Sequence, residues 1–242
     1  MTETLGAITW PEAARVAGSR TLVVPIGSTE QHGPHLPLGT DTMVVEALCR
    51  ALAESNPAKV MLSPTIPIGA SDEHRGFAGT LSVGTEALAA SLQALAASAS
   101  RFDGILFATT HGGNLPAMKL ARAVLGDQGA RCLWWWPGAV PPALAREGDL
   151  HAGWMETSIM LHLAPRLVRR DLASRGAMGS GDKLMAVLRS QGVAAVSANG
   201  VIGDPATASA ETGRLLFEAM LTDLGATLAT GSGGGSGGGN AG

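Results

Sequence analysis

Residues 23–42 read VVPIGSTEQHGPHLPLGTDT, and this stretch decides how the fold is interpreted. The apolar run from Thr21 to Ile26 predicts a buried strand, which Gly27 ends. The sequence TMVVEALCRALAE repeats its apolar positions with the period of a helix, so a helix is expected from about Asp41 to Ser55. A strand joined to a helix by one short loop is typical of a βαβ unit.

The loop between that strand and that helix carries four ionisable side chains within twelve residues: Glu30, His32, His35 and Asp41. Glu30 and His32 are two residues apart, so they project to the same side of an extended segment. Carboxylate and imidazole groups presented together favour a divalent metal site, and a carboxylate such as Asp41 can bridge two ions. The alternative interpretation is a polar loop in which Asp41 only caps the helix.

The rest of the chain repeats the alternation of strand and helix. Further strands are expected at 60–62, 104–110, 131–136 and within 194–204, and further helices at 9–18, 85–100, 114–125, 211–228 and in a short segment that ends at 163. This alternation predicts an α/β fold with three layers, α/β/α, around a mostly parallel central sheet. In such sheets ligands bind at the carboxyl ends of the strands, where the polar loops fall.

Composition narrows the possible partners and compartments. The 242 residues carry a formal net charge of −3 with scattered Lys and Arg, which argues against a nucleic-acid partner. Two cysteines make no disulfide framework, and no signal peptide or apolar run of about 18 residues is present, so a cytoplasmic protein with no membrane partner is expected. Residues 1–230 are expected to form one domain and the Gly/Ser-rich residues 231–242 a flexible tail.

Two further polar segments follow predicted elements. His111 comes directly after the strand ILFATT, in the segment THGGN, where the alternative is a histidine held by a hydrogen bond at a strand end. In HAGWMETS, residues 151–158, His151 and Glu156 flank the start of a helix. There Glu156 would be stabilised by the helix dipole even as a purely structural carboxylate. His111 follows a buried strand as Glu30 does, which makes it a candidate further ligand.

Together these three segments resemble the creatininase family of metal-dependent amidohydrolases. Residues 30–41 fill the family pattern E-x-H-G-x-H-x-P-x-x-x-D, and HAGWMETS is similar to its H-A-G-x-x-E-T-S motif. THGGN is similar to the NGHGGN motif, with Thr109 and Thr110 as mild departures. The resemblance covers about residues 20–228, and it implies the same fold and an amide-bond hydrolase.

The resemblance also implies a site with two divalent metal ions, Zn, Mn or Fe. Its implied metal ligands are Glu30, His32, Asp41, His111 and Glu156. His151 is implied to carry a proton to the leaving amine, with Glu156 as the second catalytic residue. The substrate pocket is expected to include His35, Ser71, Glu73, His74, Gly112, Gly113, Asn114 and Trp136. A role for His35 in orienting the ligands, a surface position for His74 and a buried strand end for Trp136 remain open.

Departures from creatininase itself concern the substrate. Creatininase carries a metal-binding Glu two residues after the counterpart of His111, where this chain has Gly113. It also uses a Tyr next to that His, and this chain contains no Tyr. Both departures argue against creatinine as the substrate, and Glu156 is then the implied replacement ligand.

Residues 192–220 resemble another branch of the family, the peptidases of mycofactocin systems. This resemblance implies cleavage of a modified precursor peptide near its C-terminus, with release of a Val-Tyr-derived dipeptide. It also implies a homo-oligomer, for which a hexamer is one possibility. The alternatives are a creatininase-like amidohydrolase that acts on a small cyclic amide or a formamide, and a non-catalytic metal-binding oligomer.

Overall fold

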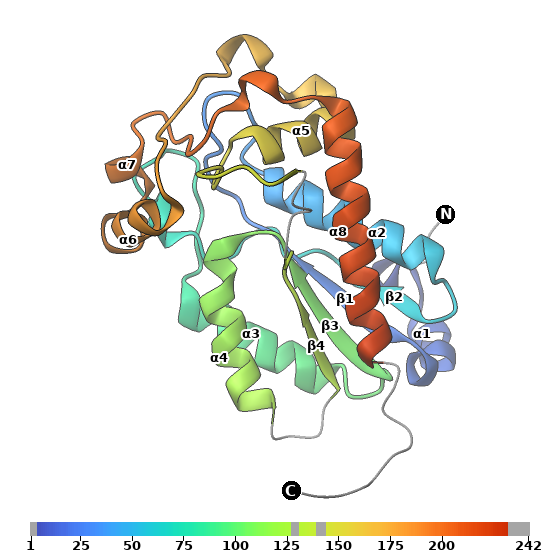
Figure 1. Cartoon of the computed structure of the whole chain (residues 1–242). Coiled ribbons are helices and arrows are strands. Elements are labelled where there is room, and N and C mark those ends of the chain that lie inside the picture. Colours follow the sequence, from blue (N-terminus) through green and yellow to red (C-terminus); the bar gives the residue numbers. More distant parts are fainter. Residues whose placement is uncertain (1–3, 127–130, 139–143, 232–242) are drawn as a thin grey trace, which may run out of the picture.

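A four-stranded parallel sheet organises the structure, a computed structural model that describes residues 4–126, 131–138 and 144–231. The strands are β1 (Thr21–Ile26), β2 (Val60–Leu62), β3 (Gly104–Thr109) and β4 (Cys132–Trp135). Their order in the sheet is β2-β1-β3-β4, and every neighbouring pair is parallel (Figure 1). The four strands lie where the apolar runs predict them.

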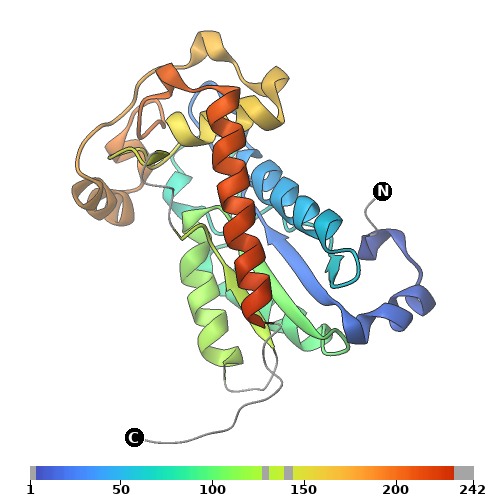
Figure 2. The same ribbon diagram turned by 45° about the vertical axis from the view of Figure 1, so that its right-hand side comes forward.

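Helices cover both faces of this sheet and form the outer layers (Figures 1 and 2). On one face lie α2 (Thr40–Ser55) and α8 (Ala210–Gly231); on the other lie α3 (Thr85–Ser98) and α4 (Leu115–Leu125). Parallel strands need such crossover helices, and the helices bury the sheet on both sides. The predicted three-layer α/β/α class is therefore confirmed.

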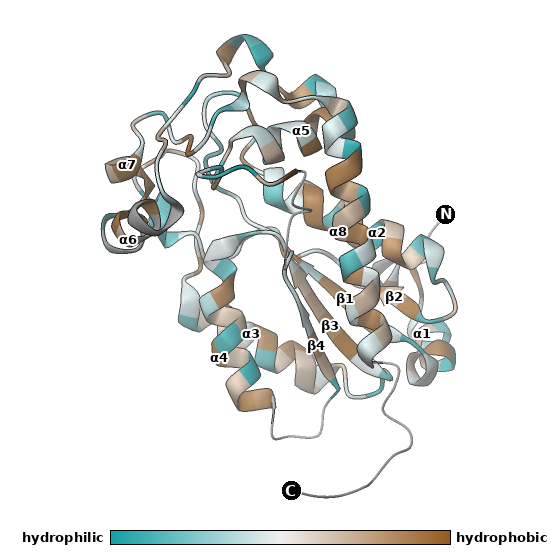
Figure 3. Ribbon diagram, in the orientation of Figure 1, coloured by the Kyte–Doolittle hydropathy of each residue, from teal (hydrophilic) through white to brown (hydrophobic). Residues whose placement is uncertain are grey.

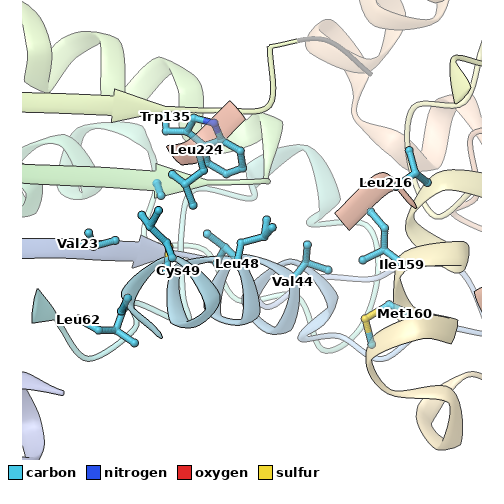
Figure 4. Close-up of a cluster of buried hydrophobic side chains, with 14 of the residues drawn as sticks. Val23, Val44, Leu48, Cys49, Leu62, Trp135, Ile159, Met160, Leu216 and Leu224 are labelled. Carbon is cyan, nitrogen blue, oxygen red and sulfur yellow. The ribbon is translucent and has the colours of Figure 1, made fainter. Parts of the chain in front are cut away.

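Alternate residues of each strand serve two separate cores, because successive side chains of a strand point to opposite faces. Val23 and Leu106 pack with α2, α8 and α5 (Trp154–Leu163), whereas Leu22 and Phe107 pack with α3 and α4. Figure 4 shows part of the first core, with Val44, Leu48 and Cys49 of α2 among Trp135, Leu224 and other buried side chains. The hydropathy colours of Figure 3 show the apolar character of β1 and β3.

A further group of helices lies beyond the carboxyl ends of the strands (Figures 1 and 2). It consists of α5 (Trp154–Leu163), α6 (Gly181–Gln191) and α7 (Val193–Val196). The structure also contains α1 (Trp10–Val16) and short 3₁₀ turns at Leu5–Ala7, Ala17–Ser19, Asp72–His74, Gly112–Asn114, Pro165–Leu167, Arg170–Leu172 and Pro205–Thr207. Among the described residues, no helix is long and apolar enough to span a membrane.

One predicted strand is wrong in part. The segment 194–204 begins as the end of helix α7 and contributes only isolated bridges, in which Ile202 pairs with His151 and Ala177. Gly192 begins this turn of helix at a φ of 81°, a conformation that a glycine adopts readily. The predicted tail lies almost wholly outside the described residues, at 232–242.

Candidate metal centre

Four segments bring their ionisable side chains together at the carboxyl ends of β1 and β3. The loop after β1 supplies Glu30 and His32, and α2 supplies Asp41 in its first turn. His111 follows β3, and His151 and Glu156 come from the turn into α5. All except Glu156 are buried. The sequence thus predicted a group of residues that the fold does bring together.

Asp41 lies at the centre of this group. Its Oδ2 is 3.4 Å from Nε2 of His32 and 3.4 Å from Nδ1 of His111, and it accepts a hydrogen bond of 2.7 Å from the Ser28 hydroxyl. Asp41 does not cap the helix, because the N-cap residue is Gly39. Its side chain instead turns into the site, where one carboxylate oxygen faces two imidazoles.

Glu30 is fully buried and lies between two imidazoles. Its oxygens are 3.1 Å from Nε2 of His111 and 3.3 Å from Nε2 of His74. Neither oxygen has a hydrogen bond of good geometry from any described residue, and Nε2 of His32 also lacks one. Buried polar atoms without partners are costly, so these atoms are candidate donors to a bound cation. Carboxylate oxygens and an imidazole nitrogen are donors that a divalent cation would satisfy.

The charges in this cluster shift the pKa of each member. Burial disfavours an ionised Asp41, but His32, His111 and Ser28 outweigh it and hold its pKa well below the usual range. Glu30 is affected in the same way, and its pKa falls to about 2. Conversely, the facing carboxylates overcome burial and raise the pKa of His32 to about 9 and that of His111 to about 10. Without a metal, imidazolium groups balance the buried carboxylates.

The second half of the site surrounds His32. Glu156 places Oε2 3.8 Å from Nε2 of His32 and accepts a hydrogen bond of 2.6 Å from the backbone N–H of Ala152. Loss of hydration raises the pKa of the Glu156 carboxyl to about 7. The centre of the His151 ring lies 4.5 Å from that of the His32 ring, with the two planes tilted by 40°, and burial keeps the pKa of His151 well below its usual value.

The geometry offers three sets of side chains that can each surround one cation. One set is Glu30, Asp41 and His111; the second is His32, His151 and Glu156; the third is Glu30, His74 and His151. Within each set the ligand atoms lie within 4.8 Å of one another. The first set consists of three of the predicted ligands, and the second contains the other two, His32 and Glu156, together with His151.

The predicted pocket residues lie at different distances from this cluster. Ser71 Oγ is 3.4 Å and Glu73 Oε1 is 3.7 Å from Nε2 of His111. Trp136 lies against Gly112, within 3.6 Å of where a Cβ on that glycine would stand. Any side chain on Gly113 would overlap Glu73 and His111. His74 is buried beside Glu30, so it is not a surface residue.

Two pocket residues have other partners. Asn114 does not cap α4 with its side chain; it accepts from Ala70 N at 2.9 Å and donates to Gly27 O and Thr109 Oγ1, both at 3.0 Å. His35 contacts Thr157 through Nε2 at 2.8 Å, and none of the candidate metal ligands is its hydrogen-bond partner in the described structure. Asn114 therefore joins the segments that end at β1 and β3 to the 70–74 region, and His35 contacts α5.

Sequence reasoning missed Gln31. This residue is 5% exposed and lies between two predicted ligands in the EQHG segment. In an extended segment its side chain is expected to point away from Glu30 and His32, which is why the pattern gave it no role. The structure instead places its amide within hydrogen-bond distance of His74 and His151.

The fold and the cluster define a three-layer α/β protein with a buried carboxylate–imidazole centre. The family model of creatininase, described as creatinine amidohydrolase, matches residues 6–228. The chain belongs to the creatininase family, and it is a hydrolase of amide bonds.

Curated relatives fall into two groups by name. The mycofactocin precursor peptide peptidase of Mycobacterium tuberculosis (strain ATCC 25618 / H37Rv) is 44% identical over 214 residues, which are 85% of this chain and 83% of the relative. That of Mycobacterium ulcerans (strain Agy99) is 41% identical over 223 residues, 89% of this chain and 83% of the relative. The creatinine amidohydrolase of Pseudomonas putida is 30% identical over 195 residues, 69% of this chain and 74% of the relative.

Solved structures support the fold. The structure described as Creatininase Mn has a TM-score of 0.79 at 23% identity and covers 95% of this chain and 98% of its own. A mutant creatininase described as Zn-Zn type has a TM-score of 0.77 at 23% identity and covers 94% of this chain and 97% of its own. The descriptions name manganese and zinc for those proteins.

Proposed function

We propose that this chain is a metal-dependent peptidase that cleaves the modified mycofactocin precursor peptide near its C-terminus and releases a Val-Tyr-derived dipeptide. The observation that carries the proposal is the buried cluster of Glu30, Asp41 and His111 in a chain 41–44% identical to relatives named for this peptidase activity. A buried carboxylate pair beside imidazoles suits hydrolysis with metal assistance.

The residues present fit two divalent ions. Glu30 and His111 would hold one ion, His32 and Glu156 the other, and Asp41 both, since its Oδ2 faces both imidazoles. Such mixed donors accept Zn, Mn or Fe. When bound, these ions polarise the scissile carbonyl and lower the pKa of a water molecule that attacks it.

The proposed substrate approaches from the side of the least buried carboxylates. The side chains of Glu156 and Glu73 are 23% and 21% exposed, whereas those of Glu30, His32, Asp41 and His111 are at most 5% exposed. Glu156 and Glu73 are therefore the carboxylates of the cluster that lie nearest to solvent. Ser71, Trp136 and the glycines at 112 and 113 would line the pocket there, and the glycines leave room for a peptide backbone.

His151 is the proposed carrier of a proton to the leaving nitrogen. It is buried beside His32, and burial keeps it neutral in the ordinary range of pH, as its lowered pKa indicates. A neutral imidazole can accept a proton as water attacks and then release it to the amine. Because its pKa is low, a protonated His151 gives up that proton readily.

We also propose a cytoplasmic homo-oligomer. Two cysteines without a disulfide between them agree with a reducing compartment. A hexamer is the assembly that the family resemblance suggests, and light scattering of the purified protein measures it.

Incubation of the zinc- or manganese-loaded protein with the modified precursor peptide tests the activity. Mass spectrometry is expected to detect the released dipeptide and the shortened peptide, and both products should disappear with a chelator and with Asp41→Asn. Asp103→Asn is the matched control, since Asp103 pairs with Arg131 at the opposite end of β3, away from the cluster. Intact peptide in the presence of bound metal would overturn the proposal.

A second candidate activity is hydrolysis of a small cyclic amide or a formamide. The 30% identity to a creatinine amidohydrolase favours it. Creatinine and formamides tested with the same protein separate the two activities. Bound metal without turnover of any of these substrates would instead indicate a non-catalytic metal-binding oligomer.

A further inference from the structure

The side chain of Gln31 joins three segments around the candidate metal centre. Its Nε2 is 2.9 Å from Nδ1 of His74, 2.9 Å from Nε2 of His151 and 3.2 Å from the carbonyl oxygen of Gly200. A primary amide has two N–H groups, so three neighbours compete for two protons. The neighbours that accept these two amide protons determine which ring nitrogens of His74 and His151 carry a proton.

The orientation of the Gln31 amide is set by its oxygen. The backbone N–H of Gly33 donates to Oε1 at 2.9 Å, so the NH₂ group faces the imidazoles. An amide nitrogen only donates, hence Nδ1 of His74 must accept. The proton of neutral His74 then lies on Nε2, which is 3.3 Å from a buried oxygen of Glu30.

The backbone of Gln31 determines the other imidazole. Nε2 of His151 is 2.8 Å from the carbonyl oxygen of Gln31, which can only accept, and 2.9 Å from the amide nitrogen of Gln31, which can only donate. The shorter contact, to the carbonyl, favours a proton on Nε2. The second N–H of the Gln31 amide then donates to Gly200. Nδ1 of His151 is left without a proton. This assignment gives an acceptor to each N–H of the Gln31 amide and a donor to its oxygen.

The absence of a side chain at Gly200 provides the space that the Gln31 amide occupies. Gly200 has a φ of 78°, and a Cβ at this position would overlap Oε1 of Gln31. The His74 and His151 rings lie 4.5 Å apart and both face Gln31. We propose that Gln31 is a positioning residue that fixes the tautomers of both histidines, with the proton on Nε2 in each.

The variant Gln31→Glu tests this inference because it keeps the size of the side chain and replaces the two donors by an acceptor. A carboxylate at this position requires a proton on Nδ1 of His74. Nitrogen-15 NMR of histidine-labelled protein distinguishes protonated from unprotonated ring nitrogens, with signals assigned from variants that lack His74 or His151. Gln31→Met removes all hydrogen bonding of the side chain, and Gln93→Glu on α3 makes the same chemical change away from the site.

The wild-type protein is expected to show Nε2–H tautomers for both histidines, before and after zinc is bound. In Gln31→Glu the His74 signals should change to a protonated Nδ1, and Gln93→Glu should match the wild type. In Gln31→Met the single tautomer of His74 should be lost, whereas that of His151 should remain, because the backbone carbonyl of residue 31 sets it. A wild-type His74 with its proton on Nδ1, or His74 signals unchanged in Gln31→Glu, would overturn the inference.

The consequence for turnover rests on the proposed function. Residues that orient metal-site groups commonly change activity about 10- to 100-fold, so Gln31→Glu is expected to lower kcat by about that factor with KM little changed. An unchanged kcat in a variant with altered tautomers would show that the tautomers do not matter for turnover. If the wild-type protein cleaves no peptide, the proposed function fails, whereas the NMR spectra still decide the role of Gln31.

Discussion

Oε1 of Glu73 lies 3.7 Å from Nε2 of His111, in the space that a side chain at position 113 would need. A Cβ at this position would overlap Glu73, the carbonyl oxygen of Ala70 and the His111 ring at once. Glycine at 113 is therefore what allows a carboxylate from the 72–74 turn to approach the histidine that follows β3.

The first prediction concerns Gly113→Ala. The added methyl group must displace the His111 ring or the backbone at Ala70, so zinc affinity is expected to fall about 10- to 100-fold. Competition with a chelating dye measures this affinity. Gly18→Ala is the matched control, because a Cβ there meets no atom within 4 Å. Equal affinities for both variants would mean that His111 is not a ligand or that the site tolerates its movement.

The second prediction concerns Asp41→Asn, which keeps the shape of the side chain and removes its charge. An amide presents only one oxygen and no charge between His32 and His111, so it should not hold two cations together. Elemental analysis after dialysis is expected to find at most one metal ion per chain, against two in the wild type and in Asp103→Asn. Two ions retained in Asp41→Asn would exclude Asp41 as the shared ligand.

The third prediction concerns the stability that Asn114 provides. Its side chain satisfies the N–H of Ala70, the carbonyl of Gly27 and the hydroxyl of Thr109 in the interior. Each buried group left without a partner costs about 1–3 kcal/mol, so Asn114→Ala should lower the free energy of unfolding by about 2 kcal/mol or more. Urea denaturation of the metal-free protein measures the change.

Asn56→Ala is the control for this measurement. Asn56 also donates to a backbone carbonyl, that of Leu52, but it is only partly buried at the end of α2, where water can replace the bond. Its loss should cost less than about 1 kcal/mol. Similar costs for the two variants would show that Asn114 is not a special link between the loops.

The strands and helices of this protein were largely predictable from the sequence, because they depend on the local order of apolar residues. The run from Thr21 to Ile26 is buried at every position, and the helix after Asp41 begins within one residue of its expected start. The candidate site was also predictable in outline, since polar loops after parallel strands meet at one edge of a sheet. The resemblance to a family supplied the assignments of individual residues.

The contacts of individual polar side chains were less predictable, because they depend on how distant segments of the chain meet. Asp41 and Asn114 both stand at helix starts, where local rules predict capping, yet both turn toward other loops. Gln31 contacts Gly200, 169 residues away in sequence. The helical turn at Val193–Val196 follows Gly192, whose positive φ the apolar pattern of this segment did not indicate.

The last prediction concerns protons that leave when metal binds. Before binding, the carboxylates of Asp41 and Glu30 outweigh burial and raise the pKa of His32 to about 9 and that of His111 to about 10. Both imidazoles are then charged at pH 7, and each must lose its proton to become a ligand. Zinc binding should therefore release up to about two protons per chain at pH 7, and affinity should rise with pH until about pH 9–10.

The raised pKa values of His32 and His111 also determine how the stability of the metal-free protein changes with pH. A histidine in the unfolded chain has a pKa of about 6.5, so below this pH both the folded and the unfolded protein carry these protons. Above this pH the unfolded protein binds fewer protons than the folded protein. The contribution of the two imidazolium groups is thus fully present below pH 6.5 and is lost as pH rises toward 9–10. Titration calorimetry in buffers of different ionisation enthalpy counts the released protons, and melting of metal-free protein follows the loss of stability. Binding without proton release would show that His32 and His111 are already neutral in the metal-free protein.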